Sequence, residues 1–410
     1  MVAYHLPPLA GSSGIQRTLR FAQNLPSMGW QPLLLTVHPR AYEKTSDDLL
    51  ADLPPGLELR RAFALDTARH LTFKGRYLGA MARPDRWISW KFDGVRQGMQ
   101  MIREFKPDVI WSTYPIATAH VIGAELQRRS GLPWIADFRD PMAQPDYPPD
   151  PRTRASFLEI EAKAAAQARF CIFTTPGAAK DYQQRYPEGA AKTQVLENGY
   201  DEESFQQAAR VLPTAGTTSA GPIVLLHSGI VYPSERDPSA LFKALGRLCA
   251  ERKLTPAALK IRFRAAVHED LLRALAVQEG IEAFIEICPP IAYREALAEM
   301  MSVDGLLVMQ ASNCNAQIPA KTYEYLRARR PILGLTDPAG DTAWALRNAG
   351  VADIVPLDAM GEIAVALPAF LDKLRDGRAM PPHDAAVAQA SRLGRTQELK
   401  RWLESAAAGA

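Results

Sequence analysis

The sequence has little cysteine, no long apolar run and almost no excess of charge. Its four cysteines, Cys171, Cys249, Cys288 and Cys314, lie far apart and form no C-x-x-C pair, which argues against a disulfide scaffold or a zinc site. No stretch approaches the roughly 18 consecutive apolar residues of a transmembrane helix, and the opening MVAYHLPPLAGSSG lacks the features of a secretory signal. A net charge of +3 gives no reason to expect a nucleic-acid partner. These absences predict a reduced, soluble, cytoplasmic protein.

What is present is ordinary globular composition, 47% apolar and 23% charged, in a chain of 410 residues. That length suits two domains of about 200 residues each. Short apolar runs alternate with longer helix-like segments, which predicts βαβ units and hence α/β domains with doubly wound parallel sheets. We predict strands at 2–4, 33–37, 109–112, 134–138, 171–174, 194–196, 223–227, 261–266, 285–287, 305–308 and 332–335, with helices between them.

The alternation lapses once, in the Gly-, Ser-, Thr- and Pro-containing stretch QQAARVLPTAGTTSAGP at 206–222. We predict that this stretch is a linker between an N-terminal domain at 1–205 and a C-terminal domain at 223–384. The segment 385–410 is amphipathic, and we expect a helix that closes the second domain or packs back on the first. Open α/β sheets bind ligands beyond the carboxyl ends of their strands, so the expected site is a cleft between the domains.

Two motifs in the first half place glycine or charged residues at strand ends. PPLAGSSGIQR at 7–17 joins the first strand to a helix, where exposed amides favour an anion, although a plain turn and helix cap explain it equally well. The motif is neither G-x-G-x-x-G nor a P-loop. PWIADFRDP at 133–141 puts Asp137, Arg139 and Asp140 at the carboxyl end of a strand, where charged side chains often serve a site. The alternative is a local Arg–Asp pair that holds the loop.

A third motif opens the second half. LHSGIVY at 226–232 has Gly229 directly after a buried strand, and Arg236 follows in ERDP. The glycine permits close approach of a ligand, and the arginine can bind a phosphate. An ion pair between Arg236 and a neighbouring carboxylate is equally consistent with the spacing.

The fourth motif, QIPAKTYEYLRARRPIL at 317–333, is the most informative. Pro319 suits the first turn of a helix, so that amides near Ala320 and Lys321 would face an anion such as a diphosphate. Glu324 comes one turn later on the face of Lys321 and can accept hydrogen bonds from two vicinal hydroxyls, as on a ribose. A surface pair between Lys321 and Glu324 is the alternative.

In chain order, PPLAGSSGIQR, KPDVIW, PWIADFRDP, LENGYDEESF, LHSGIVY and IPAKTYEYLRARRPIL resemble segments of the family 4 retaining glycosyltransferases of the GT-B fold. The resemblance covers most of the chain and implies two Rossmann-like domains facing across a cleft. It implies a nucleotide-diphosphate sugar as donor, no further cofactor, and a glycan or lipid-linked acceptor in bacterial polysaccharide or lipopolysaccharide synthesis. The donor-binding residues that it implies are Gly11, Ser12, Ser13, Gly14, Gly229, Arg236, Gln317, Ile318, Ala320, Lys321 and Glu324.

The chain departs from the family at two site positions. Ala316 stands where the family has the first glutamate of its E-x7-E signature, so we expect Gln317 or Asn315 to contact the sugar. Arg139 stands where many relatives have histidine, and we assign it with Asp137 and Asp140 to the catalytic group that orients the acceptor. The sequence has no D-x-D, which favours a metal-independent mechanism, and the family resemblance implies hexosyl transfer with retention. A nucleotide-sugar 2-epimerase of the same architecture, or a non-catalytic nucleotide-sugar-binding protein, is the alternative.

The stretch 60–91 is basic and rich in aromatic residues. Between Glu58 and Lys91 there are eight Lys or Arg against three acidic residues. One interpretation is a patch that docks on an anionic membrane surface, which would place the protein on the inner face of the membrane. The other is a solvated face over an ordinary core. The aromatic residues concerned are Phe63, Phe73, Tyr77, Trp87 and Trp90.

Overall fold

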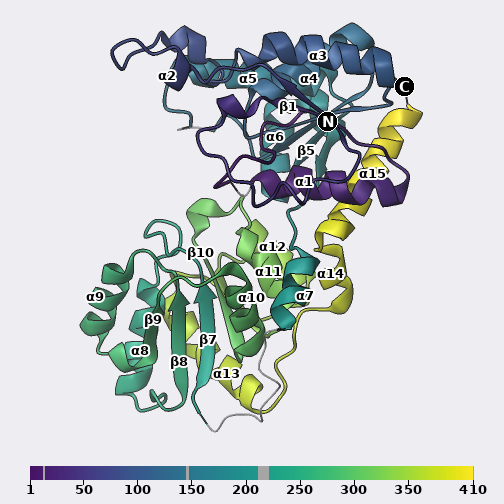
Figure 1. Ribbon diagram of the computed structural model, residues 1–410. Helices are drawn as coiled ribbons and strands as arrows, with labels where there is room; N and C mark the ends of the chain where they lie inside the picture. The colour runs from purple at the N-terminus through teal and green to yellow at the C-terminus, as the bar shows by residue number, and fades with distance from the viewer. Residues whose placement is uncertain (13, 145–146, 211–220, 410) are drawn as a thin grey trace. The chain divides into compact units, whose positions relative to one another are not determined.

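The computed structural model describes residues 1–12, 14–144, 147–210 and 221–409, which form two compact α/β units. The first comprises Met1–Glu197 and Arg392–Ala410, and the second comprises Asn198–Ser391 (Figure 1). Residues 198–205, predicted in the first domain, thus lie in the second unit, and residues 392–409 lie in the first. Most of the predicted linker, 211–220, falls outside the described residues, whereas 206–209 end a helix, α7 (Glu202–Ala209).

The first unit is built on parallel strands that the segment around Val2 joins into one layer. β1 (Leu33–Val37) pairs with β2 (Glu58–Ala62), and the strands β3 to β6 pair in that order. Val2 makes parallel bridges to Leu35 on β1 and Ser112 on β3. The remaining strands are β3 (Ile110–Thr113), β4 (Trp134–Arg139), β5 (Phe170–Phe173) and β6 (Thr193–Val195).

Alternating side chains of these strands enter two different cores, as expected for a sheet with helices on both faces. Trp134 packs in one core and its neighbour Ile135 in the other. The C-terminal helix α15 (Arg392–Ala408) packs beside α1 (Gly14–Asn24), as the yellow and purple ribbons show in Figure 1. The other helices of this unit are α2 (Thr67–His70), α3 (Trp90–Phe105), α4 (Thr118–Ser130), α5 (Pro151–Gln167) and α6 (Pro176–Arg185).

The second unit has one parallel sheet in the order β12-β11-β10-β7-β8-β9. The chain moves outward from β7 in one direction, returns at β10 and moves outward in the other, which is the Rossmann order. Its strands are β7 (Ile223–Ser228), β8 (Leu259–Arg264), β9 (Ile285–Cys288), β10 (Gly305–Gln310), β11 (Ile332–Thr336) and β12 (Ile354–Val355).

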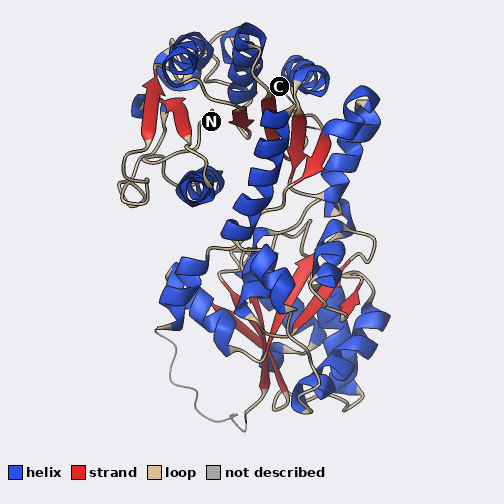
Figure 2. Ribbon diagram, turned by 90° about the vertical axis from the view of Figure 1, so that its right-hand side faces the viewer, coloured by secondary structure: helices blue, strands red, loops and turns tan. Residues whose placement is uncertain are grey.

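Successive residues of β7 and β10 again enter different cores. Leu225 packs under α8, α9 and α13, while Leu226 packs under α7, α10 and α11. Figure 2 shows the red strands of this sheet among blue helices. The doubly wound parallel α/β architecture predicted from strand–helix alternation is therefore confirmed. These helices are α8 (Ser239–Ala250), α9 (Glu269–Glu279), α10 (Tyr293–Ser302), α11 (Ala320–Ala328), α12 (Asp341–Asn348), α13 (Met360–Arg375) and α14 (Asp384–Gln389).

Among the described residues, no helix combines the length and the apolar composition that crossing a bilayer requires.

The close packing of α3 on α4 yields a stability prediction at Gly98. A Cβ placed there would lie 2.8 Å from both terminal methyl carbons of Leu126. Overpacking of this kind costs about 1–3 kcal/mol, and the better helix propensity of alanine offsets up to about 1 kcal/mol. We expect Gly98→Ala to lower the free energy of unfolding, measured by urea denaturation, by about 1–2 kcal/mol.

Gly361→Ala is the matched control, because a Cβ on this α13 glycine meets nothing within 4 Å. We expect this variant to be as stable as the parent protein or slightly more stable. Equal stability of both alanine variants would contradict the packing argument.

Candidate functional site

The strand order of the second unit reverses between β7 and β10, where such sheets leave a crevice beyond their carboxyl ends. A pocket of about 280 Å³ lies at this point. The end of β7, the loop after it, the middle of β10 and the start of α11 contribute its walls. The lining residues are His227, Ser228, Gly229, Ile230, Tyr232, Arg236, Val308, Met309, Pro319, Ala320, Lys321, Thr322 and Tyr325.

The loop after β7 turns at Gly229 and then presents Arg236. Gly229 has a φ of 139°, a backbone conformation that side-chain-bearing residues rarely adopt. The Arg236 guanidinium lies over the Tyr232 ring, 5.3 Å from its centroid, and donates to the Ile230 carbonyl at 3.1 Å. Its contact with the Glu235 carboxylate is a loose 3.9 Å. Since a guanidinium has five N–H donors, this arrangement holds Arg236 in place and leaves donors for an anion.

Helix α11 begins at the pocket, as the fourth motif predicted. Pro319 is its N-cap residue, and Lys321 lies in its first turn. The Lys321 ammonium is 3.0 Å from Glu324 Oε2 and 5.9 Å from the ring centroid of Tyr293. Glu324 Oε1 accepts a hydrogen bond from the Tyr293 hydroxyl at 2.9 Å. The pair between Lys321 and Glu324 therefore exists, and it holds a positive charge beside the positive end of the helix dipole.

Two buried side chains that had no predicted role stabilise the end of β7. The hydroxyl oxygen of Tyr325 accepts the Ser228 N–H at 2.7 Å, which fixes α11 against the strand. Burial raises the pKa of Tyr325, so this hydroxyl stays protonated. Burial also lowers the pKa of His227 to about 4, and its Nδ1 lies 3.0 Å from the Leu307 carbonyl. The neutral imidazole therefore donates from Nδ1.

The pocket brings together four predicted donor-binding residues: Gly229, Arg236, Ala320 and Lys321. Glu324 lies next to it through its pair with Lys321. Two others, Gln317 and Ile318, are not among the residues that line it. The Gln317 carbonyl accepts from the Thr342 hydroxyl at 2.9 Å, and Ile318 packs in the core beneath α11. The donor-binding roles of these residues stay predictions.

In the first unit, the carboxyl end of β4 is tied to α1 by a buried ion pair. Arg17 Nη2 and Nε donate to the two carboxylate oxygens of Asp137 at 2.8 and 2.9 Å. The Thr113 hydroxyl donates to the same carboxylate at 2.9 Å, and Asp137 is fully buried. Arg17 also donates to the carbonyls of Leu196 and Glu197 at 3.0 and 3.2 Å. Asp137 therefore pairs with Arg17, 120 residues away, in place of the local Arg–Asp pair considered as the alternative, and the sequence had assigned Arg17 no role.

Arg139 lies next to the glycine loop and is held by backbone carbonyls. It has a left-handed φ of 66°, and its guanidinium donates to Tyr114 O and Gly14 O, both at 3.2 Å. Burial, and secondarily the charge of Arg17, lowers the pKa of Arg139 to about 10. A Cβ on Gly14 would come within 2.3 Å of His5 Nδ1, so glycine is required where α1 begins.

The rest of the glycine loop forms a turn in front of α1. Ser12 Oγ accepts the Gly14 N–H at 3.2 Å and lies 3.1 Å from His5 Nδ1. Burial and the nearby Arg139 lower the pKa of His5 to about 4, so its ring is neutral. Gly11 has a φ of 76°, and Ser13 lies outside the described residues.

Asp140 follows Arg139 at the same sheet edge. Its Oδ1 is 3.4 Å from the Thr174 hydroxyl, which also donates to the Arg139 carbonyl at 2.9 Å. Burial raises the pKa of Asp140 above its ordinary value, although the charge of Arg139 opposes the shift. The structure therefore brings Asp137, Arg139 and Asp140 together with the glycine loop, and their catalytic roles stay predictions.

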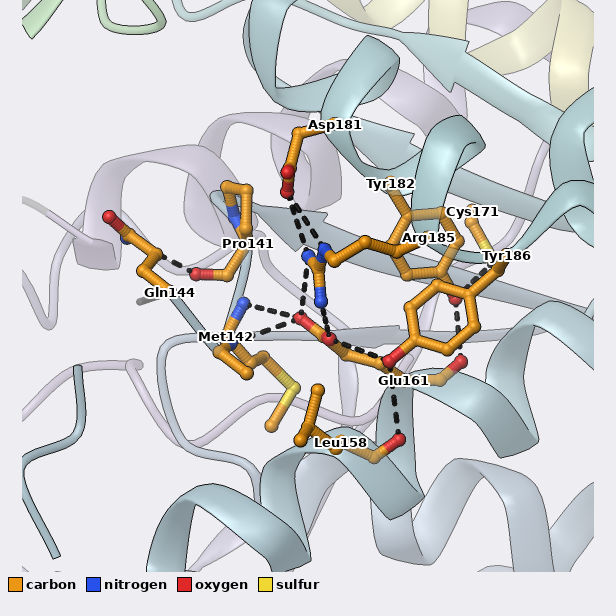
Figure 3. Close-up of polar contacts among 11 residues, drawn as sticks. Pro141, Met142, Gln144, Leu158, Glu161, Cys171, Asp181, Tyr182, Arg185 and Tyr186 are labelled. Carbon is orange, nitrogen blue, oxygen red and sulfur yellow. Dashed lines mark hydrogen bonds and ion pairs between the residues drawn. The ribbon is translucent and has the colours of Figure 1, made fainter. Parts of the chain in front are cut away.

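A buried carboxylate on α5 anchors the loop that follows Asp140 (Figure 3). Glu161 Oε1 accepts the backbone N–H groups of Met142 and Ala143 at 2.8 and 3.1 Å. Its Oε2 pairs with Arg185 at 2.5 Å and accepts from the Tyr186 hydroxyl at 3.0 Å. Every strong acceptor position of Glu161 is occupied, so this residue supports the site without being available to a ligand.

Among the described residues, no group of three His, Cys, Asp or Glu side chains is placed to hold a metal ion.

We compared the chain with a family model, with curated protein sequences and with solved structures. Residues 13–199 match the family model described as a glycosyl transferase 4-like domain. No curated protein matches the chain in sequence. Among solved structures, Anabaena HepE in complex with UDP has a TM-score of 0.64 at 13% identity, covering 98% of this chain and 99% of that one. Sucrose-phosphate synthase from Thermosynechococcus elongatus has a TM-score of 0.62 at 14% identity, covering 100% and 99%.

A weaker likeness is to a Listeria monocytogenes structure described as a UDP-N-acetylglucosamine 2-epimerase, with a TM-score of 0.51 at 10% identity over 98% and 95% of the two chains. At these identities a likeness establishes the fold. The chain has the GT-B fold, and the family match together with these neighbours supports a family 4-like glycosyltransferase.

The buried ion pair of the first unit gives a stability prediction. Asp137→Asn leaves the Arg17 guanidinium buried without a counter-charge, so we expect the free energy of unfolding to fall by about 3–5 kcal/mol. Replacing both partners, in Arg17→Met/Asp137→Leu, should cost less than the sum of the single changes, because no charge is left unpaired. Urea denaturation of the single and double variants measures both effects.

The control is Arg128→Ala, which removes the exposed partner of Glu125 on α4. Exposed pairs of this kind contribute at most about 1 kcal/mol. If Asp137→Asn lowered the free energy of unfolding no more than Arg128→Ala does, the structural role assigned to the buried pair would be wrong.

Tyr325→Phe tests the support of the pocket wall. The change leaves the Ser228 N–H without its acceptor, and a buried donor left unpaired costs about 1–3 kcal/mol. We expect the free energy of unfolding to fall by that amount. Tyr232→Phe is the control, because its half-exposed ring still covers Arg236, and we expect little change. Equal stability of the two phenylalanine variants would contradict the assignment.

Proposed function

We propose that the protein is a cytoplasmic glycosyltransferase that moves a hexosyl group from a nucleotide-diphosphate sugar to a glycan or lipid-linked acceptor, with retention and without a metal ion. The observation that carries the proposal is the pocket at the β7–β10 switch point, where Arg236, Lys321 and the start of α11 meet. The family match over 13–199 and the fold likeness to a UDP-bound protein support it.

The chemistry of this pocket suits a diphosphate. Arg236 offers a planar set of donors and Lys321 a point charge, a combination that matches phosphate oxygens. The first backbone amides of α11 have no partner inside the helix and add to the positive potential. We assign the donor diphosphate to these groups and the donor ribose to Glu324, whose carboxylate would exchange its contact with Lys321 or Tyr293 for sugar hydroxyls.

The same groups would act on the transition state. When the bond between the sugar and the diphosphate breaks, the electron pair stays on a phosphate oxygen and negative charge grows there. Fixed donors aimed at that oxygen stabilise the charge without reorganising. The acceptor hydroxyl forms the new bond on the face that the diphosphate leaves, and its proton passes to the departing phosphate. This course accounts for retention.

We assign the acceptor to the sheet edge of the first unit. Arg139 and Asp140 are the residues there that we expect to touch it, and we expect the loop Gly11 to Gly14 to face both the acceptor and the donor diphosphate. Asp137 we assign to a positioning role, since its carboxylate oxygens are occupied by Arg17 and Thr113. In bacterial polysaccharide or lipopolysaccharide synthesis such an acceptor would be a growing glycan or a lipid-linked sugar.

The proposal predicts the effect of removing each donor contact. We expect Arg236→Ala to lower kcat for donor turnover by about 100-fold, as the loss of one fixed donor to a developing oxyanion does. Lys321→Ala should have a similar effect, and Glu324→Ala should raise KM for the donor. The measurement is release of free nucleotide from UDP, GDP, ADP and TDP sugars in the presence and absence of EDTA.

Arg273→Ala is the matched control, since Arg273 is an exposed arginine of the same unit that pairs with Glu269. Unchanged turnover in both Arg236→Ala and Glu324→Ala would refute the proposed donor site. Product analysis separates the other functions: an epimerised sugar nucleotide indicates a 2-epimerase, and binding without chemistry indicates a non-catalytic protein. Loss of activity in EDTA would refute metal independence.

A further inference from the structure

An exposed apolar loop follows α2 in the first unit. Every residue from Phe73 to Met81 is exposed, and we call these nine residues the apolar loop. Phe73 and Leu78 are 78% and 72% exposed, and Tyr77 and Met81 are 44% and 39% exposed. Large apolar side chains that gather at the surface commonly mark an interaction site.

The apolar loop differs from the rest of the stretch 60–91. Trp90 is fully buried, and the ring of Trp87 packs 4.7 Å from that of Tyr4. The Trp87 indole N–H donates to the Ala41 carbonyl at 3.1 Å. Both tryptophans therefore belong to the ordinary core. The exposed aromatic and aliphatic surface is concentrated in the loop itself.

The loop lies in a segment that has only positive charges. Between Asp66 and Asp85 the sequence has no acidic residue and four basic ones: Arg69, Lys74, Arg76 and Arg83. Arg83 lies 3.9 Å from Asp150, and Arg69 donates to the Tyr42 carbonyl. Within the described part of the chain, Lys74 and Arg76 form no ion pair, although the Lys74 ammonium lies 5.7 Å from the Phe73 ring centroid.

The tip of the loop is an ordered turn. Phe73 and Arg76 exchange backbone hydrogen bonds of 2.9 and 3.0 Å. The two residues between them, Lys74 and Gly75, have φ values of 49° and 76°, as a two-residue hairpin turn with positive φ requires. Phe73 and the two unpaired cations are thus presented together by a defined backbone.

We propose that the apolar loop docks on an anionic lipid bilayer. Phe73 and Leu78 enter the boundary between headgroups and acyl chains, while Lys74 and Arg76 contact lipid phosphates through their long side chains. A bilayer uses both features of the loop, because apolar burial and attraction to anionic headgroups act together there. A soluble polyanion would pair with the cations and leave Phe73 and Leu78 in water. The inference does not depend on the proposed function, although docking would bring a glycosyltransferase to lipid-linked acceptors.

Co-sedimentation with vesicles tests the proposal without measuring sugar transfer. We expect the protein to bind vesicles of phosphatidylcholine with phosphatidylglycerol and to bind vesicles of phosphatidylcholine alone far more weakly. Lys74→Gln/Arg76→Gln should lower the partition coefficient on anionic vesicles by about 25-fold, about fivefold for each charge. Phe73→Ser/Leu78→Ser should also reduce binding, and added salt should weaken binding of the parent protein.

Val365→Ser and Lys243→Gln are the controls, since both side chains are exposed in the second unit and should leave binding unchanged. Phe73→Trp adds a depth readout: lipids brominated on their acyl chains should quench its fluorescence. Equal binding to neutral vesicles, absence of binding, or loop variants that bind like the parent would overturn the proposal. Binding of the loop to another protein with no vesicle binding would also overturn it.

Discussion

The buried pair of Arg17 and Asp137 holds the carboxyl edge of the sheet in the first unit together. Its two charges join α1 to β4, while the Thr113 hydroxyl and the carbonyls of Leu196 and Glu197 extend the contacts to the ends of β3 and β6. Both side chains are almost fully buried, so water could not replace the hydrogen bonds that either partner would lose if the other were removed. The glycine loop in front of α1 and the residues after β4 are neighbours because this pair fixes the elements that carry them.

The corresponding edge of the second unit uses a neutral contact in place of an ion pair. Tyr325 accepts the Ser228 N–H, so that α11 is held against β7 without burying a charge. The charged side chains of Arg236 and Lys321 therefore take no part in the contact that holds α11 against β7. Because the contact between α11 and β7 does not involve these two lining cations, an anion can bind them without breaking that contact.

Sequence pattern was sufficient for the architecture, because buried strands are visible as apolar runs. It also singled out Gly229, Arg236, Ala320 and Lys321, which the structure brings into one pocket. It missed β2, Glu58–Ala62, whose residues ELRRA are mostly polar and whose strand pairs on one side only. It also assigned part of α7 to a linker, since composition does not show that Ala208 is buried. Arg17 and Tyr325 stand inside the quoted motifs, yet their roles depend on contacts across 120 and 97 residues, which no local spacing encodes.

Arg139 is held differently from several other arginines of the chain. Most arginines of this nearly neutral chain have a carboxylate partner, as at Glu161 and Glu299. Arg139 instead donates to two carbonyls in a left-handed conformation, and burial lowers its pKa, so the fold bears a cost to keep a cation there. Arg236 is held by the Ile230 carbonyl and the Tyr232 ring, with a loose contact to Glu235. A buried cation held by backbone carbonyls keeps its charge beside Asp140, which is why the proposed acceptor role includes Arg139.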